Sequence, residues 1–380
     1  MVRKIQIIGK IKILHVLWRG HSGGAERFVR DITFYSNKTK FEHQVLFLSD
    51  PGRFGRIIAE SGIPVHSLGM RRSFSFINAL GFRRLIRSYK PDIIHNHSKD
   101  FITNAFICRI NSAVKIFFEH GGDLISNNSK RAILFYHCFI RYYDLVLANS
   151  EYIRQRILAL NKVNPQKVRT FYIGIDPTPY QSDRGQGLNK PPIFVDANKK
   201  VIGVVGRLVE EKGIDDFIKV ADEIQRVYQD VIFLIVGDGK KRVLLQRMAA
   251  QHEADIRFLG DRSDVPDILN IFDIFLFTSK RESYGIALLE SMAARVPVLG
   301  FAVGGANEIL KNGGGVLLET RNHKELARLT VEFLMNPTAC KRLSTTGYAN
   351  LMDNFHIRKS IDILEQEYLS LLSPRRDYFC

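Results

Sequence analysis

Short apolar runs alternate with longer segments of mixed polarity along most of the chain. The apolar runs are typical of buried parallel strands, and the segments between them are typical of helices that cover a sheet. In the first half, strands are predicted at 12–18, 43–49, 64–68, 92–97, 114–118, 144–148 and 168–173. One helix is predicted after the first strand and its loop, ending at about residue 37. Further helices are predicted at 54–61, 75–89, 101–110, 131–142 and 151–160.

The second half repeats this alternation and therefore predicts a second sheet of the same kind. Its predicted strands are at 200–205, 231–236, 255–259, 271–277 and 296–300. Its predicted helices are at 213–228, 265–272, 284–294, 324–335, 340–354 and 357–371. The fold class is α/β, with open parallel sheets that carry helices on both faces.

A chain of 380 residues is long enough for two domains of ordinary size. Residues 177–198 are rich in Pro, Gly, Asn and Asp and are predicted to link the domains. The predicted N-terminal domain is therefore 1–176, and the predicted C-terminal domain is 199–356.

The segment from Phe277 to Glu308 contains the strongest chemical signal. A buried strand ends in the polar loop 278–283, and a helix follows, for which Ser283 is the expected cap. Backbone N–H groups and the positive end of the helix dipole gather at such a turn. This loop is therefore a candidate phosphate-binding site.

Glu282 and Glu290 stand eight positions apart on either side of this turn. Two carboxylates so placed suit the hydroxyl groups of a sugar. The alternative is an ordinary amphipathic helix with one exposed Glu. Glu290 lies within the largely apolar stretch A-L-L-E-S-M-A-A, where an unpaired carboxylate would be costly, and this favours a binding role.

Arg207 and Lys212 lie in a loop that follows the first strand of the second sheet. Two cations beside glycines suit a diphosphate leaving group. The alternative is a solvated charge pair with Glu210 and Glu211.

The first half has two candidate positions at predicted strand ends. Gly23 and Gly24 lie in a strand-to-helix turn that does not follow G-x-G-x-x-G, so a nicotinamide site is weakly supported, and a plain tight turn is the alternative. His120 follows a strand and precedes two glycines, where a group facing a ligand is expected. For a loop histidine the alternative is an ordinary polar residue.

The stretch S-K-R-E-S-Y-G-I-A-L-L-E-S-M-A-A-R-V-P-V-L-G-F-A-V-G-G-A-N-E-I resembles the signature of the family-four retaining glycosyltransferases of GT-B fold. The resemblance implies two Rossmann-like domains facing a cleft, with a C-terminal helix at about 357–372 crossing back to the first domain. It also implies that Glu282 lies against the donor sugar and that Glu290 holds the ribose. The amides of Tyr284, Gly285 and Ile286 are implied to face the diphosphate.

The resemblance extends over nearly the whole chain. It implies that Arg207 and Lys212 bind the two phosphates and that the G-G-A-E motif at Gly23 and Gly24 borders them. It implies that His120, in E-H-G, contacts the donor sugar near the reacting centre. Backbone near Gly237 and Leu259 is implied to border the nucleoside. The chain departs from the family pattern at Ile173, where Asn is usual, and at Asn307, where Pro is common.

The net charge of +16 is confined to the first half of the chain. Residues 1–175 hold 28 Lys and Arg against 11 Asp and Glu (+17), and residues 176–380 hold 27 against 28 (−1). A protein that docks on an anionic membrane and a nucleic-acid-binding protein both show such asymmetry, and a soluble basic surface is the plain alternative. The predicted helix 75–89, with Arg83, Arg84 and Arg87 among Phe, Ile and Leu, is a candidate membrane surface, as is the segment after the His120 loop.

Neither a metal nor another cofactor is expected, because the chain has no D-x-D motif and no H-E-x-x-H spacing. His95 and His97 match the family's H-x-H strand end and are expected to support the cleft without a chemical role. The four cysteines are scattered, which favours a reducing compartment. No apolar run is long enough to span a membrane, and no signal peptide is predicted.

The sequence therefore predicts a metal-independent glycosyltransferase that moves a sugar from a nucleotide-sugar to an acceptor hydroxyl with retention. The expected acceptor is a lipid-linked glycan or an envelope polysaccharide such as lipopolysaccharide. The expected location is cytoplasmic, peripheral at the inner face of the membrane. A GT-B-fold epimerase and a catalytically inactive scaffold are alternatives. Nucleic-acid binding leaves the Glu pair and the Arg/Lys pair without a role.

Overall fold

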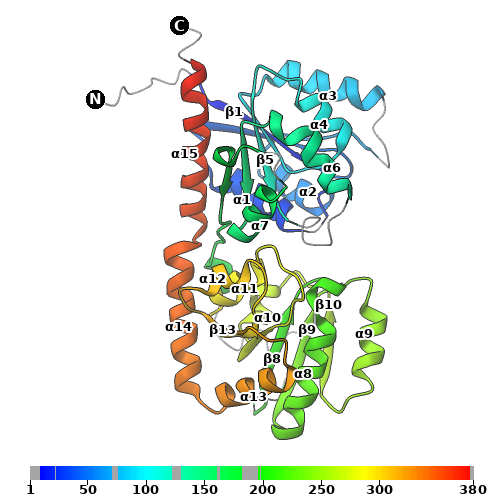
Figure 1. Ribbon diagram of the computed structural model, residues 1–380, viewed down its shortest axis with the longest axis vertical. Helices are drawn as coiled ribbons and strands as arrows, with labels where there is room; N and C mark the ends of the chain where they lie inside the picture. The colour runs from blue at the N-terminus through cyan, green and yellow to red at the C-terminus, as the bar shows by residue number, and fades with distance from the viewer. Residues whose placement is uncertain are drawn as a thin grey trace, which may run out of the picture. The chain divides into compact units, whose positions relative to one another are not determined.

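The computed structural model describes residues 9–376 except 22, 71–75, 122–129, 161–162, 182–195 and 197. The chain divides into two compact units (Figure 1). Unit 1 comprises Met1–Ile173 and Ile357–Cys380, and unit 2 comprises Gly174–His356.

The described part of unit 1 contains a sheet of seven parallel strands in the order β3-β2-β1-β4-β5-β6-β7. The strands are β1 (Ile11–Leu17), β2 (Phe41–Phe47), β3 (Val65–Ser67), β4 (Ile93–Asn96), β5 (Val114–Glu119), β6 (Leu145–Ala148) and β7 (Val168–Thr170). The helices are α1 (Gly24–Tyr35), α2 (Gly52–Glu60), α3 (Phe76–Tyr89), α4 (Phe101–Ile107), α6 (Lys130–Phe139), α7 (Glu151–Leu158) and α15 (Ile357–Arg376).

Alternate residues of these strands enter cores on opposite faces of the sheet. On one face, Leu14 and Val16 pack with residues of α3, α4, α6 and α7, among them Phe82 and Phe135. On the other face, Leu17 packs with residues of β2, α1 and α2. Both faces of the central strands are thus buried, which explains why their sequences are largely apolar.

The C-terminal helix α15 belongs to unit 1 although it follows unit 2 in the sequence. The side chain of Tyr368 in this helix is fully buried, and its hydroxyl lies 2.7 Å from Nδ1 of His95. At the end of α1, the Ser36 hydroxyl donates to the Glu365 carboxylate at 2.7 Å. The return of the last helix to the first domain is confirmed, and Figure 1 shows α15 running along unit 1.

The sheet of unit 2 has six described parallel strands in the order β10-β9-β8-β11-β12-β13. They are β8 (Lys200–Val205), β9 (Val231–Val236), β10 (Ile256–Gly260), β11 (Ile274–Phe277), β12 (Val298–Phe301) and β13 (Gly315–Leu318). The helices are α8 (Ile214–Val227), α9 (Arg242–Ala249), α10 (Val265–Leu269), α11 (Ile286–Ala293), α12 (Ala306–Leu310), α13 (His323–Leu334) and α14 (Pro337–Asn354).

Both sheets have the strand order of a Rossmann fold, so the predicted α/β class with two parallel-sheet domains is confirmed. In this order the direction of winding reverses between β1 and β4 in unit 1 and between β8 and β11 in unit 2. Ligands of open α/β sheets bind at the carboxyl ends of strands at such a switch point. The loops after these four strands are therefore the candidate positions of a ligand-binding site.

Several local details of unit 2 differ from the expectations. The helix after β11 begins at Ile286 instead of 284, and its cap is Gly285, with φ of +104°, instead of Ser283. A side-chain cap requires an extended backbone, and the left-handed turn at Gly285 replaces it. β11 begins at Ile274, because residues 271–272 complete the turn after α10. The short strand β13 was not predicted, since its residues are only half-buried and give a weak apolar signal.

Residues 177–181, which were expected to belong to the linker, lie in unit 2. Thr178–Tyr180 forms a short 3₁₀ helix, and the Tyr180 side chain is buried. None of the helices in the described ranges is both long enough and apolar enough to span a bilayer.

Candidate functional site

The loops that follow β8, β9 and β11 in unit 2 are joined by backbone hydrogen bonds. Leu208, after β8, donates its N–H to the Asp238 carbonyl, after β9, at 2.9 Å. Lys280, after β11, donates its N–H to the Glu211 carbonyl at 2.8 Å. The two loops at the switch point, after β8 and after β11, therefore form one surface.

Gly213 and Gly285 permit this close packing. Gly213 has a φ of +59°, and a Cβ at this position would lie 2.0 Å from the Thr278 carbonyl oxygen. Gly285 has a φ of +104°, which the turn into α11 requires. Side chains other than glycine are strained at such angles, so both turns depend on these residues.

Arg207 is exposed in the loop after β8, and no side chain of the described residues pairs with its guanidinium. Other cations of this surface are engaged: Lys280 pairs with Glu210 at 3.0 Å and with Asp215 at 2.5 Å, and Lys241 pairs with Glu210. A planar guanidinium with five free donors fits a phosphate group. The geometry thus leaves Arg207 available to an anion.

Lys212 forms an ion pair with Glu282, with Nζ 2.5 Å from Oε2. Glu282 is 9% exposed, so its charge is largely removed from water and needs this partner. From the sequence, the alternative was that Lys212 forms a solvated charge pair with Glu210 and Glu211. In the structure its partner is Glu282, 70 positions away in the loop after β11. The structure thus brings together two of the predicted site residues. An ammonium group has three donors, so Lys212 can hold Glu282 and also contact a phosphate.

Tyr284, Gly285 and Ile286 form the turn that leads into α11. Tyr284 is buried, whereas the backbone N–H groups of Gly285 and Ile286 donate to no atom of the described residues. Unpaired N–H groups at the start of a helix, with the helix dipole behind them, favour an anion. Glu290 lies one turn further along α11, and its carboxylate accepts a hydrogen bond from the Tyr180 hydroxyl at 2.8 Å.

Gly237 and Leu259 lie at the ends of β9 and β10. Gly237 donates its N–H to the Gly260 carbonyl at 2.7 Å, and a Cβ on it would lie 2.0 Å from the Gly206 carbonyl oxygen. Leu259 is half-buried. These two positions therefore border the same surface, beside the loop of Arg207.

In unit 1, Gly23 and Gly24 are at the start of α1, after β1, with Gly23 in an extended conformation. Before them in the chain, Gly20 donates its N–H to the Asp50 carbonyl at 2.9 Å. His120 follows β5, and its Nε2 lies 3.1 Å from Nδ1 of His97. These residues are all at the carboxyl edge of the unit 1 sheet. They belong to a different unit from Arg207 and Glu282.

The position of His120 is set by its neighbours. Its carbonyl accepts a hydrogen bond from the Asn149 side chain at 3.1 Å, and its ring stacks on Phe118 with centroids 4.5 Å apart. Burial, and to a lesser extent the positive charge of Lys99, lower the pKa of His120 from the usual 6.5 to about 3. His120 is therefore a neutral imidazole at physiological pH, and it can act as a hydrogen-bonding group but not as a cation.

Sequence reasoning missed three residues at or beside these positions. Glu119 is 1% exposed; its carboxylate accepts the N–H of Gly121 at 2.6 Å and pairs with Lys99 at 2.8 Å. Tyr180, the partner of Glu290, was placed in the linker. Arg281, beside Glu282, is half-buried, and no described side chain pairs with it. The sequence shows that Glu119 directly precedes His120, but it does not show which groups Glu119 contacts.

Two family models match the chain. Glycosyltransferase Family 4 matches residues 22–178, and Glycosyl transferases group 1 matches residues 187–350. The chain belongs to the group 1 glycosyltransferases. The family resemblance expected from the motif around Glu282 is thereby confirmed, and the comparisons do not favour the epimerase or the inactive scaffold.

Relatives of this group 1 glycosyltransferase act in several pathways. The lipopolysaccharide core biosynthesis glycosyltransferase LpsE of Rhizobium meliloti (strain 1021) is 23% identical over 370 residues, which cover 96% of this chain and 100% of LpsE. The N-acetyl-alpha-D-glucosaminyl L-malate synthase of Bacillus anthracis is 27% identical over 236 residues, and the match spans 60% of each chain. Among solved structures, Anabaena Alr3699/HepE in complex with UDP and glucose superposes with a TM-score of 0.82 at 22% identity, covering 95% of this chain and 99% of HepE. The fold of unit 1 and unit 2 is therefore the GT-B fold.

Proposed function

We propose that this glycosyltransferase transfers a hexosyl or related sugar from a nucleoside diphosphate donor to an acceptor hydroxyl, with retention of configuration and without a metal at the diphosphate. The observation that carries the proposal is the surface at the unit 2 switch point. It combines the free guanidinium of Arg207, the Lys212–Glu282 pair and the open N–H groups at the start of α11. The complex of HepE with UDP and glucose supports a nucleotide-sugar as the donor.

In this proposal the chemical task of unit 2 is to stabilise the departing diphosphate. As the bond from the anomeric carbon to the phosphate oxygen breaks, negative charge grows on the leaving group. Arg207, Lys212 and the N–H groups of Gly285 and Ile286 supply donors for that charge, and fixed donors of this kind contribute roughly 3–4 kcal/mol each in the transition state. The acceptor oxygen then bonds to the anomeric carbon on the same face, and its proton passes to the leaving phosphate oxygen.

The remaining predicted residues are assigned to the sugar and the nucleoside. We assign Glu282 to the hydroxyls of the donor sugar, because Lys212 holds its carboxylate at the surface next to the phosphate site. We assign Glu290 to the ribose and Gly237 and Leu259 to the border of the nucleoside. The roles predicted for His120, Gly23 and Gly24, which lie in unit 1, stay predictions.

Replacing Arg207 by Ala should weaken the binding of the cognate nucleoside diphosphate by about 10- to 100-fold, because a charge-assisted hydrogen bond contributes about 1.5–3 kcal/mol. Isothermal titration calorimetry measures the effect directly. Arg328→Ala is the matched control, since Arg328 is an exposed arginine of α13 in the same unit. Equal affinity of the Arg207→Ala variant and the control would place the phosphates elsewhere.

We further propose a lipid-linked or envelope-glycan acceptor reached at the inner face of the cytoplasmic membrane. LpsE, which the chain matches over its whole length, is named for lipopolysaccharide core biosynthesis. In unit 1, α3 carries exposed Arg83, Arg84 and Arg87 with no acidic residue on the helix and no partner among the described side chains. Arg71 and Arg72 lie outside the described residues.

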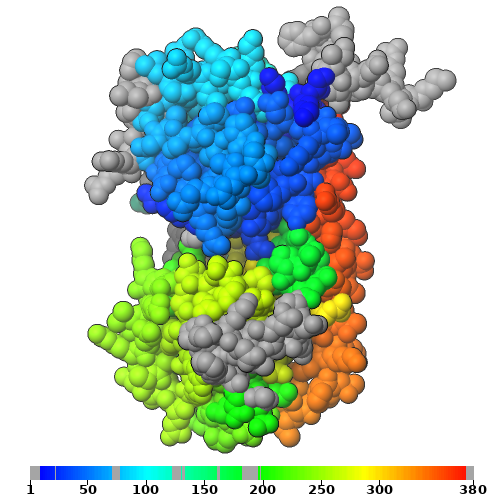
Figure 2. Space-filling model, turned by 180° about the vertical axis from the view of Figure 1, so that it is seen from behind, coloured from blue at the N-terminus to red at the C-terminus, as the bar shows by residue number. Residues whose placement is uncertain are grey.

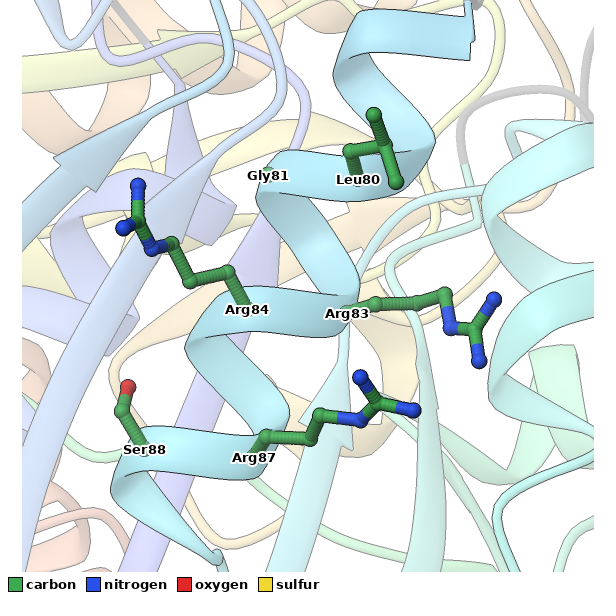
Figure 3. Close-up of a pocket in the computed structure, with 6 residues that line it drawn as sticks. All are labelled: Leu80, Gly81, Arg83, Arg84, Arg87 and Ser88. Atoms are coloured by element: carbon green, nitrogen blue, oxygen red, sulfur yellow. The ribbon is translucent and has the colours of Figure 1, made fainter.

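The structure limits which side chains of α3 are available to a membrane. Phe82 and Tyr89 face the core, whereas Leu80 is 49% exposed. Figure 3 shows Arg83 and Arg87 extending from one side of the helix and Arg84 from the other. Arg83 and Arg87 also border a small hollow lined by apolar side chains of α3, of α4 and of the segment after α4: Phe82, Ile86, Phe106 and Ile110. The helix, cyan in Figure 2, is part of the outer surface of unit 1.

The variant Arg83→Ala/Arg84→Ala/Arg87→Ala should bind vesicles of anionic phospholipid roughly 100-fold more weakly than the unmodified protein, because each cation near such a surface contributes about 1 kcal/mol. Co-sedimentation with phosphatidylglycerol and with phosphatidylcholine vesicles measures this. The charge-matched control is Lys324→Ala/Lys341→Ala/Arg342→Ala, three exposed cations of unit 2. Equal loss in both triple variants would mean that net charge, and not α3, determines the binding.

A further inference from the structure

Four histidines lie on one face of the unit 1 sheet, where apolar side chains are expected. His15 on β1, His43 on β2 and His95 on β4 are buried, and His97 just after β4 is half-buried. The parallel register pairs His15 with His95, and Ile13 with His43. Because residues two apart on a strand share a face, all four histidines point to the same side.

His15, His95 and His97 each use one ring nitrogen in a hydrogen bond. In each case the partner atom can accept the bond as a neutral group. Nε2 of His15 lies 3.0 Å from Nδ1 of His43. Nδ1 of His95 lies 2.7 Å from the Tyr368 hydroxyl, and Nδ1 of His97 lies 3.1 Å from Nε2 of His120. The same three histidines can therefore each donate an N–H outward to a fixed neighbour.

The second ring nitrogen of each of these histidines has no hydrogen-bond partner among the described residues. The unpaired atoms are Nδ1 of His15, Nε2 of His95 and Nε2 of His97, all of them buried. Buried polar atoms without a partner are rare and costly, and they indicate an ion or a water at the site. The three histidines also offer one ligand nitrogen each within 4.8 Å of the others.

We propose that His15, His95 and His97 form a binding site for a transition-metal ion of the zinc class, in which His43, Tyr368 and His120 fix the three ligands from outside. Metal-bound histidines almost always donate their other N–H to an outer partner, and each of these three has one. A donor set of three imidazoles suits zinc, cobalt, nickel or copper and excludes magnesium and calcium, which require oxygen ligands.

The size of the site agrees with such an ion. Zinc–nitrogen bonds of about 2.0–2.1 Å place tetrahedral ligands roughly 3.3 Å apart, so the three nitrogens need a small inward rotation of their side chains. The metal would join β1 to β4 at the centre of the sheet and, through Tyr368, fix α15. Through His97 it would also fix the tautomer of His120. It is therefore a structural and positioning site, separate from the diphosphate surface in unit 2.

The expectation that no metal is bound rested on spacing along the chain. The ligands of D-x-D and H-E-x-x-H motifs lie close together along the chain, whereas the proposed ligands come from β1 and from the end of β4, about 80 positions away. His15 and His95 become neighbours through strand pairing alone.

The test is elemental analysis of the full chain, free of any affinity tag, after expression in zinc-supplemented medium and gel filtration with a chelator. We expect about one zinc per chain in the unmodified protein and at least a tenfold lower content in the His15→Gln and His95→Gln variants. His137→Gln is the control, because His137 is an exposed histidine of the same unit, and it should retain the metal. Metal retained equally in all three variants would place it elsewhere and overturn the proposal.

A second measurement does not depend on the folding of the variants. Protein produced with cobalt should show the visible absorption bands of a four- or five-coordinate Co²⁺ site, and X-ray absorption at the metal edge should show imidazole nitrogens as ligands. Unmodified protein that binds neither zinc nor cobalt would overturn the proposal and assign the unpaired nitrogens to buried water.

Discussion

Glu282→Gln should lower kcat by about 100- to 1,000-fold, the loss seen when one fixed transition-state contact is removed. Glutamine keeps the shape of the side chain but cannot carry the negative charge that Lys212 neutralises at 2.5 Å. It also loses an acceptor for the hydroxyl groups of the donor sugar. Initial rates of transfer with the cognate donor measure the effect, and circular dichroism verifies the fold.

Glu253→Gln is the control for this variant, since Glu253 is an exposed carboxylate of unit 2. It should leave kcat unchanged. A folded Glu282→Gln variant that turns over at the rate of this control would remove Glu282 from the site.

Lys212→Met should lower kcat/KM by a similar factor of about 100 to 1,000 and should also destabilise unit 2. The activity falls because a cation that faces the leaving diphosphate is lost. The stability falls because Glu282, 9% exposed, keeps a charge without a partner, at a cost of roughly 1–3 kcal/mol. Transfer kinetics and chemical denaturation measure the two effects separately.

The double variant Lys212→Met/Glu282→Gln separates the structural role of the pair from its catalytic role. Removing both charges leaves no unpaired carboxylate, so stability should return close to that of the unmodified protein while activity stays low. Strictly additive losses of stability would show that the two side chains do not act as a pair.

The alternation of apolar runs was enough to predict both parallel sheets, because buried strands of this kind are apolar on both faces. It could not predict β13, whose residues are half-buried. It also misplaced the start of α11, since Ser283 resembles a side-chain cap and the left-handed turn at Gly285 depends on packing against other loops.

For the candidate site, the sequence predicted residues whose roles stay predictions, and it could not show their partners. Glu282 was identified from its motif, but its pairing with Lys212 depends on the loops after β8 and β11 lying side by side. Tyr180 was assigned to a linker because its neighbours are turn-forming residues, although it is buried and bonds Glu290. Spacing along one segment cannot show contacts that the sheet creates between distant strands.

The central claim is that unit 2 binds the nucleoside diphosphate of a sugar donor through Arg207 and Lys212. Its most direct test is thermal denaturation of the unmodified protein and the Arg207→Ala variant with UDP, GDP, ADP, dTDP and CMP and their sugars, with no divalent metal added. A ligand at about 100 times its Kd stabilises the folded state by about 2.7 kcal/mol. We predict that one nucleobase series raises the melting temperature of the unmodified protein and that the rise is smaller in the variant. No rise with any of the nucleotides would contradict the proposed donor site.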